Sequence, residues 1–203
     1  RYLTKDERLD TPFLIHYDLS GAHAIPDKKT LSDDAPDWVI ETERALGKAW
    51  HKLVDSLGFE QPPIDQDNQY PEDPPGGAYD LYFTNFGWYG LTTPDGKIQS
   101  TIQGDDYYGY LEVHSNFGST NLFNTTGVPA LKVTVAHELF HLFHMAYTFD
   151  LDDLWLYEFT ASWFEEINYP EVNDYVNYVI TFFNDPRPLH LGSKVNRYPL
   201  TGY

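Results

Sequence analysis

The apolar and polar positions along the chain predict strands first and helices afterwards. Residues 12–17 are rich in strand-forming side chains and are followed by a Ser-Gly pair, which indicates a strand that ends in a turn. Residues 78–83 and 107–113 have the same character, and we interpret residues 87–90 and 93–96 as turns between them. These segments together predict a sheet.

A helix is predicted between the first two of these strands. Asp33, Asp34 and Pro36 provide capping carboxylates and a proline suited to a first helical turn, and Gly58 provides a stop signal. The apolar stripe between these signals consists of Val39, Leu46, Trp50, Leu53 and Leu57.

Three further helices are predicted over residues 129–147, about 153–168 and 171–184. Strands followed by helices favour an α+β fold, in which a mixed sheet packs beside a helical C-terminal subdomain. The chain is long enough to bury a sizeable core, and no repeat or hinge divides it, so we expect residues 1–203 to form one domain.

The charge of the chain restricts its partners. It has 13 Lys and Arg against 31 Asp and Glu, a formal net charge of -18, which disfavours nucleic acid and anionic lipid surfaces. The acidity favours a solubility role, with Ca²⁺ binding as the alternative. Asp65 and Asp67 resemble the start of a calcium loop, but the glycine and the final glutamate of such a loop are missing, so an acidic surface loop is the preferred interpretation.

Two absences in the sequence add to this picture. There is no cysteine, so disulfides and thiolate catalysis are excluded, and histidines and carboxylates remain as tight ligands for a transition metal. No run of about 18 apolar residues predicts a membrane-spanning helix. Since Arg1 is not an initiator methionine, we expect a processed fragment of a longer, secreted precursor.

The candidate chemistry lies in the first of the three C-terminal helices, where the sequence reads His-Glu-Leu-Phe-His. His137 and His141 are four residues apart and therefore lie one helical turn above each other, so both can bind one Zn²⁺. Glu138 lies beside them as the candidate general base. A catalytic zinc site also needs a third protein ligand and an open position.

The next helix supplies that third ligand. One of its faces carries two carboxylates and two small residues, Glu158, Ala161, Ser162 and Glu165. The short connection over residues 148–152 favours an antiparallel arrangement, which brings Glu158 alongside the histidines. The sequence therefore predicts one zinc ion held by His137, His141 and Glu158.

These motifs resemble those of gluzincin-type zinc metallopeptidases, and most closely a family of secreted bacterial metalloproteases. That family combines His-Glu-x-x-His with Trp-x-x-Glu-x-Thr-Ala-x-Trp-x-Glu, which corresponds here to Trp155, Glu158, Thr160, Ala161, Trp163 and Glu165. The resemblance extends, in order, over residues 15–17, 36–39, 79–82 and 170–175. It implies a zincin-like fold, a polypeptide substrate, and a secreted, bacterial protein.

The sequence departs from the broader gluzincin pattern beside the third ligand. Tyr157 replaces the Asn that often precedes the ligand Glu, and Ser162 replaces the Asp that often follows it. Glu165 is therefore a candidate to orient a ligand histidine, with a solvated helix end as the alternative. His144 shares the helix face of His137 and His141, but seven residues of helix span about 10 Å, so we prefer a packing role for it.

The function expected from the sequence is peptide hydrolysis by a zinc-activated water, with Glu138 as the base. A donor to the oxyanion is also expected, and the sequence leaves several candidates open: Tyr175, Tyr178, His190 and Tyr198. The alternative is a non-catalytic extracellular module that binds zinc or calcium, as a degenerate zincin or an adhesion or matrix protein. A glutamate at the base position between the histidines favours the enzyme.

Overall fold

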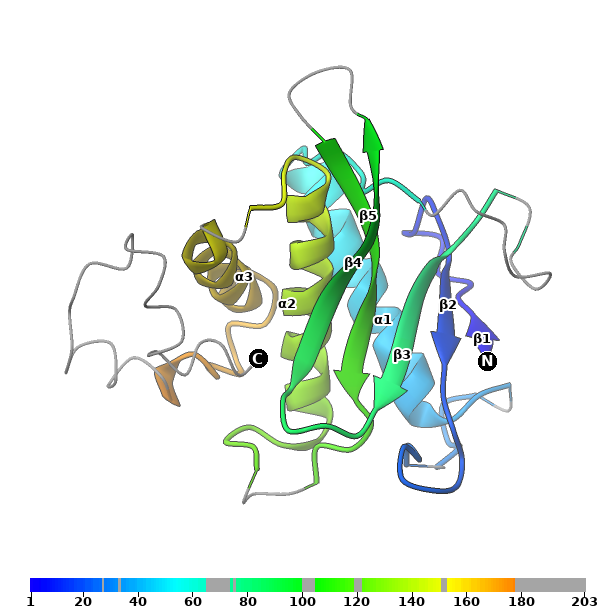
Figure 1. The fold of residues 1–203 in the computed structure, drawn as a ribbon. Coiled ribbons are helices and arrows are strands. Elements are labelled where there is room, and N and C mark those ends of the chain that lie inside the picture. Colours follow the sequence, from blue (N-terminus) through cyan, green and yellow to red (C-terminus); the bar gives the residue numbers. More distant parts are fainter. Residues whose placement is uncertain are drawn as a thin grey trace.

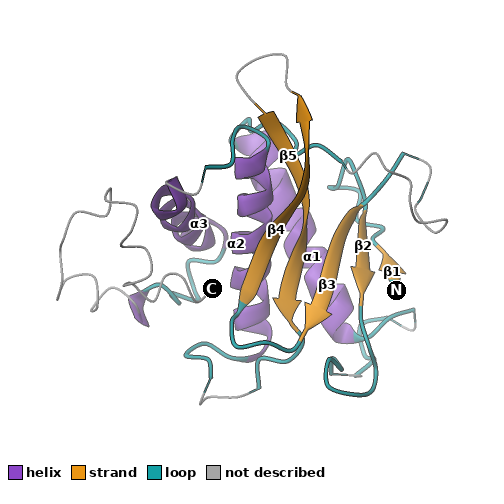
Figure 2. Ribbon diagram, viewed as in Figure 1, coloured by secondary structure: helices purple, strands orange, loops and turns teal. Residues whose placement is uncertain are grey.

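The computed structural model describes most of the first 177 residues. The described ranges are 1–26, 28–32, 34–64, 74, 76–99, 105–118, 122–150 and 153–177. Within them the protein is an α+β structure, with one five-stranded sheet and three α-helices (Figure 2). Among the same residues, no helix is both long and apolar enough to cross a lipid bilayer.

The sheet is mixed and has the strand order β1-β2-β3-β5-β4. Its strands are β1 (Tyr2–Leu3), β2 (Phe13–His16), β3 (Tyr79–Thr84), β4 (Gly90–Gln99) and β5 (Asp105–His114). The central strands β2, β3 and β5 are parallel, whereas β1 and β4 pair antiparallel to their neighbours. This order makes β4 an edge strand of the described sheet.

Two helices cover one face of this sheet (Figure 1). They are α1 (Asp37–His51), which continues as a π-helical turn, η1 (Lys52–Ser56), and α2 (Gly127–Met145). The third helix, α3 (Leu154–Asn168), packs against α2, and α2 in turn packs against β4 and β5. The helix α2 thus lies between α3 and the edge strand (Figure 1).

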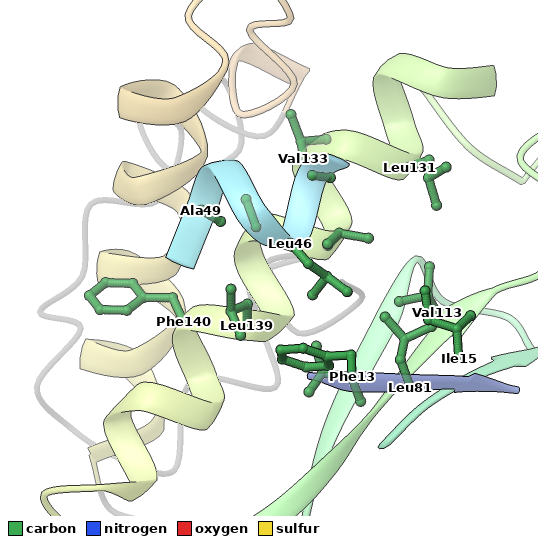
Figure 3. Close-up of a cluster of buried hydrophobic side chains, with 14 of the residues drawn as sticks. Phe13, Ile15, Leu46, Ala49, Leu81, Val113, Leu131, Val133, Leu139 and Phe140 are labelled. Carbon is green, nitrogen blue, oxygen red and sulfur yellow. The ribbon is translucent and has the colours of Figure 1, made fainter. Parts of the chain in front are cut away.

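The hydrophobic core fills the layer between the sheet and the two helices. Alternation along β3 sends Tyr79, Leu81 and Phe83 into this layer, as the period of a strand requires. Figure 3 shows how the strands and helices contribute to it, through Phe13, Ile15, Leu46, Ala49, Leu81, Val113, Leu131, Val133, Leu139 and Phe140. The helix α2 is therefore fixed along most of its length by packing.

Most of the predicted elements are confirmed, with shifts of a few residues at their ends. The stripe of the first helix is buried at Val39, Leu46, Trp50 and Leu53, but Leu57 is exposed because it lies beyond the end of η1. The predicted carboxylate cap is wrong, since the N-cap is Pro36 and no side chain caps the helix.

Two other predictions are corrected by the structure. The predicted turn at residues 93–96 lies inside β4, where the register with β5 shifts between Pro94 and Gly96. Proline and glycine are tolerated there because an edge strand and a bulge do not need every ladder hydrogen bond. The predicted helix from Glu171 does not begin there, since residues 170–172 and 174–175 form turns and helical residues appear only at 176–177. The remainder of the predicted helix, beyond residue 177, lies outside the described residues.

Candidate metal centre

The two histidines of the motif lie on one face of α2, next to each other. The rings of His137 and His141 have their centroids 4.6 Å apart, as residues four apart on a helix should. The side chain of His137 is fully buried, and that of His141 is 14% exposed. Only His141 of the two therefore reaches solvent.

The helix α3 brings two carboxylates to these rings. Glu158 Oε2 lies 3.3 Å from His137 Nε2, and Glu158 Oε1 lies 3.6 Å from His141 Nε2. Glu165 Oε1 lies 2.6 Å from His137 Nδ1, on the other side of the same ring. Ala161, fully buried between the two carboxylates along α3, lets the helices approach this closely.

The arrangement fits the requirements of a metal site. One ligand atom each from His137, His141 and Glu158 lie within 4.8 Å of one another. Two ligand atoms held at about 2.1 Å from a tetrahedral ion lie about 3.4 Å apart, which is close to the two histidine-to-carboxylate distances. Two imidazoles and one carboxylate are also a donor set typical of catalytic zinc.

The charges at the centre depend on its burial and on the carboxylates. Burial opposes the positive charge of His137, but hydrogen bonds to Glu158 and Glu165 outweigh it and raise the pKa of His137 to about 10. Burial lowers the pKa of His141 to about 3, against the opposing effect of Glu158. Burial alone would raise the pKa of Glu158, but His141 and His137 lower it, so Glu158 is ionised at neutral pH.

Glu138 follows His137 on α2 and contacts β4. Its side chain is buried, and the Thr92 hydroxyl lies 2.7 Å from its Oε2 and 2.8 Å from its backbone carbonyl oxygen. Burial raises the pKa of Glu138 to about 7, against the opposing effects of His137 and Thr92. A Cβ atom on Gly90 would lie 2.5 Å from Glu138 Cγ, so only glycine leaves the space that this side chain uses.

A cavity of about 310 Å³ opens onto the centre between β4, α2 and α3. Its polar lining includes Glu138, His141, His144 and Glu158. Its apolar walls include Leu91, Pro94, Met145, Phe149 and Leu154. An apolar cavity with a few converging polar groups is the usual form of a binding or active site.

The remaining candidates fall into two groups. His144 is not part of the converging set, and instead its Nε2 lies 2.9 Å from Thr160 Oγ1 and its ring stacks on Tyr157. Tyr175 is half-buried and does not line the cavity. Three candidate oxyanion donors and the acidic pair of the suspected calcium loop lie outside the described residues: Tyr178, His190, Tyr198, Asp65 and Asp67.

Sequence reasoning missed the contribution of β4. Gly90 and Thr92 alternate along this strand and both face Glu138, but residues 87–90 and 93–96 were interpreted as turns. The signal that was present is the Leu-Thr-Thr run between them, because adjacent β-branched residues are typical of strands.

No protein-family model, curated protein or solved structure matches the chain.

Proposed function

We propose that this protein is a zinc-dependent metallopeptidase of zincin-like architecture, in which His137, His141 and Glu158 hold the ion and Glu138 is the general base. The observation that carries the proposal is the placement of the Glu158 carboxylate across both histidine Nε2 atoms, at 3.3 and 3.6 Å. A single ion in that space would have three protein ligands and an open side towards the cavity.

A bound zinc ion supplies Lewis acidity, which acidifies water and polarises a carbonyl oxygen. The chain supplies the base. With a pKa raised by burial to about 7, Glu138 accepts a proton from water near neutral pH and returns it to the departing amine. A carboxylate with an ordinary pKa would be a weaker base for the same step.

Thr92 holds Glu138 in both of its protonation states. When Glu138 is ionised, the Thr92 hydroxyl donates to Oε2. When Glu138 carries a proton, the same hydroxyl turns to donate to the carbonyl oxygen of residue 138 and accepts from the carboxylic acid. The base therefore keeps its position while the proton moves.

Glu165 orients the histidine that is most deeply buried. The proton on His137 Nδ1 is donated to Glu165 Oε1, which leaves Nε2 as the atom that faces the ligand position. A carboxylate in this position also makes the imidazole a stronger ligand.

The edge strand β4 suits an extended polypeptide substrate. Within the described residues β4 pairs only with β5, so its other edge is available to a polypeptide in the β conformation. Residues of β4 line the cavity next to Glu138, so a peptide bond held there lies near the base. The apolar walls of the cavity are suited to apolar side chains of that polypeptide.

The variant Glu138→Gln tests the proposal. It keeps the size of the side chain and removes the basic carboxylate, so we expect full zinc stoichiometry and a loss of about 10² to 10⁴ in rate on casein. The matched control is Glu60→Gln, which makes the same change on an exposed loop residue and is expected to keep wild-type activity. Equal casein hydrolysis by Glu138→Gln and wild type, with zinc confirmed in both, would exclude Glu138 as the base. Zinc binding without any hydrolysis by the wild type would favour the non-catalytic module.

A further inference from the structure

The face of the sheet opposite to α1 and α2 contains a second hollow, of about 410 Å³. It is formed by residues of β3, β4 and β5 whose neighbours along each strand point into the core. Besides Tyr79, which also belongs to the core, three tyrosines and three carboxylates line it, namely Asp80, Tyr82, Asp95, Tyr108, Tyr110 and Glu112. No lysine or arginine is among the described residues that line it.

Aromatic rings form a row across three strands at this hollow. His16 of β2 stacks on Tyr82 of β3 with ring centroids 4.2 Å apart, and Tyr82 meets Tyr110 of β5 edge to face at 5.6 Å. The faces of tyrosine rings attract cations, because the π electrons make those faces negative.

Carboxylates flank this aromatic row. Glu112 is directly opposite Tyr82 in the register of β3 and β5. Asp80 lies two residues before Tyr82 on the same face, and its Oδ1 lies 2.6 Å from His16 Nε2, so Glu112 is the carboxylate on which the cation site depends. Burial raises the pKa of Glu112 above its ordinary value, so its negative charge is poorly solvated. A cation placed beside Glu112 would replace part of the lost solvation.

A bulge in β4 adds the third carboxylate. The register with β5 shifts between Pro94 and Gly96, so Asp95 is the extra residue, and it lines the hollow. Bulges commonly redirect a side chain in this way. At Gly96 a Cβ atom would collide with the Tyr108 ring, so the glycine lets that ring lie across β4.

We propose that this hollow binds a lysine or arginine side chain of a polypeptide. Tyrosine faces combined with carboxylates, and with no lysine or arginine among the described lining residues, are complementary to an organic cation. The position of the hollow indicates a polypeptide as the carrier, because Pro94 lines the catalytic cavity and the next residue, Asp95, lines the hollow.

The alternation of side chains along a β-strand explains how one polypeptide can contact the cavity on one face of the sheet and the hollow on the other. A chain that pairs with the edge of β4 opposite to β5, which no described strand occupies, has successive side chains on opposite faces of the sheet. One set then points to the cavity beside Glu138, and the other points to the tyrosines. Lysine and arginine are long enough to extend over β4 towards Tyr108 and Tyr110. This choice of carrier rests on the polypeptide binding proposed above, whereas the cation chemistry of the hollow does not.

The test is a binding measurement, in which hydrolysis plays no part. A blocked, fluorescein-labelled peptide of alternating arginine and serine is titrated with the Glu138→Gln chain, and anisotropy gives the Kd. A matched probe has citrulline in place of arginine, which keeps the shape and removes the charge. We expect the citrulline probe to bind at least about tenfold more weakly, and Tyr82→Leu and Glu112→Gln each to weaken arginine-probe binding about fivefold.

Control variants separate the hollow from the general attraction of an acidic chain. Glu60→Gln removes the same charge as Glu112→Gln at an exposed residue that does not line the hollow, and Phe159→Leu removes an exposed aromatic ring on α3. Both are expected to leave the Kd unchanged, and Tyr82→Phe, which retains the ring, is expected to bind like the parent. Melting curves of each variant establish that it is folded.

Three results would overturn the proposal. If Glu60→Gln and Glu112→Gln weakened probe binding equally, the overall charge of the chain, and not the hollow, would explain the binding. An unchanged Kd for folded Tyr82→Leu would mean that the aromatic row does not contribute to binding. Displacement of the probe by spermidine at the affinity of the peptide itself would identify a free polyamine, not a polypeptide, as the ligand. The binding test does not measure catalysis. If the peptidase assay failed while Tyr82-dependent binding remained, the proposed enzyme function would be excluded and the proposed cation site would be retained.

Discussion

Replacing Gly90 with alanine tests whether the position of Glu138 decides the activity. The φ angle of Gly90 is not positive, so the backbone itself accepts alanine. The new methyl carbon would lie 2.5 Å from Glu138 Cγ and 2.6 Å from its Oε1, which is about 1 Å inside ordinary van der Waals contact. Glu138 is 1% exposed and cannot move out into solvent, so its carboxylate must shift within the site.

The size of the effect follows from that overlap. A shift of about 1 Å in a catalytic group costs roughly a hundredfold in rate, or about 2.7 kcal/mol of transition-state stabilisation. The extra methyl group in a packed position also costs about 1–3 kcal/mol of folding stability. We expect Gly90→Ala to keep stoichiometric zinc, because the three atoms nearest to the new methyl group all belong to Glu138 and not to a ligand residue, and to melt at a lower temperature than the wild type.

The assay is casein hydrolysis under saturating zinc, with metal content and melting temperature measured on the same samples. The matched control is Gly87→Ala, in the bend before β4, where a Cβ atom meets nothing within 4 Å. That variant should have wild-type activity. Wild-type activity in folded Gly90→Ala would refute the reasoning, since it would mean that Glu138 tolerates displacement.

Two further predictions concern metal binding. Glu165→Gln removes the carboxylate behind His137 and is expected to weaken zinc binding about 10- to 100-fold in chelator competition, whereas Glu166→Gln on the same helix should not. Because His137 has its pKa raised to about 10, zinc binding at pH 7 should displace a proton, and affinity should rise with pH up to about 10. Without metal, the stability due to this raised pKa is complete below about pH 6.5 and is lost as the pH rises through about 10. Calorimetry in buffers of different ionisation enthalpy measures the proton release, and identical heats in all of them would contradict it.

The parts of the site that were predictable from sequence are those set by local geometry. The four-residue spacing of His137 and His141 places their rings next to each other, because any α-helix brings residues four apart to one face. The approach of Glu158 follows from a short loop and from the small side chain of Ala161, which can also be read along the chain. The helix end at Asn168 was predicted, but the helix start at Glu171 was wrong, because residues 170–172 and 174–175 form turns.

The part that was not predictable is the strand beside Glu138, and the reason is a conflict between local and tertiary preference. Thr93-Pro-Asp-Gly96 has the composition of a turn, and pairing with β5 over the whole of β4 overrides that preference. The cost is small at an edge, where proline loses no inner hydrogen bond and the extra residue forms a bulge. Alternation along the strand places Gly90, Thr92 and Pro94 on the side of α2 and Asp95 on the opposite face, where it lines the hollow. The bulge accommodates the extra residue without ending the strand, because pairing with β5 resumes at Gly96. A turn-like sequence inside an edge strand therefore still lets one strand contact Glu138 on one face and present a carboxylate to the hollow on the other.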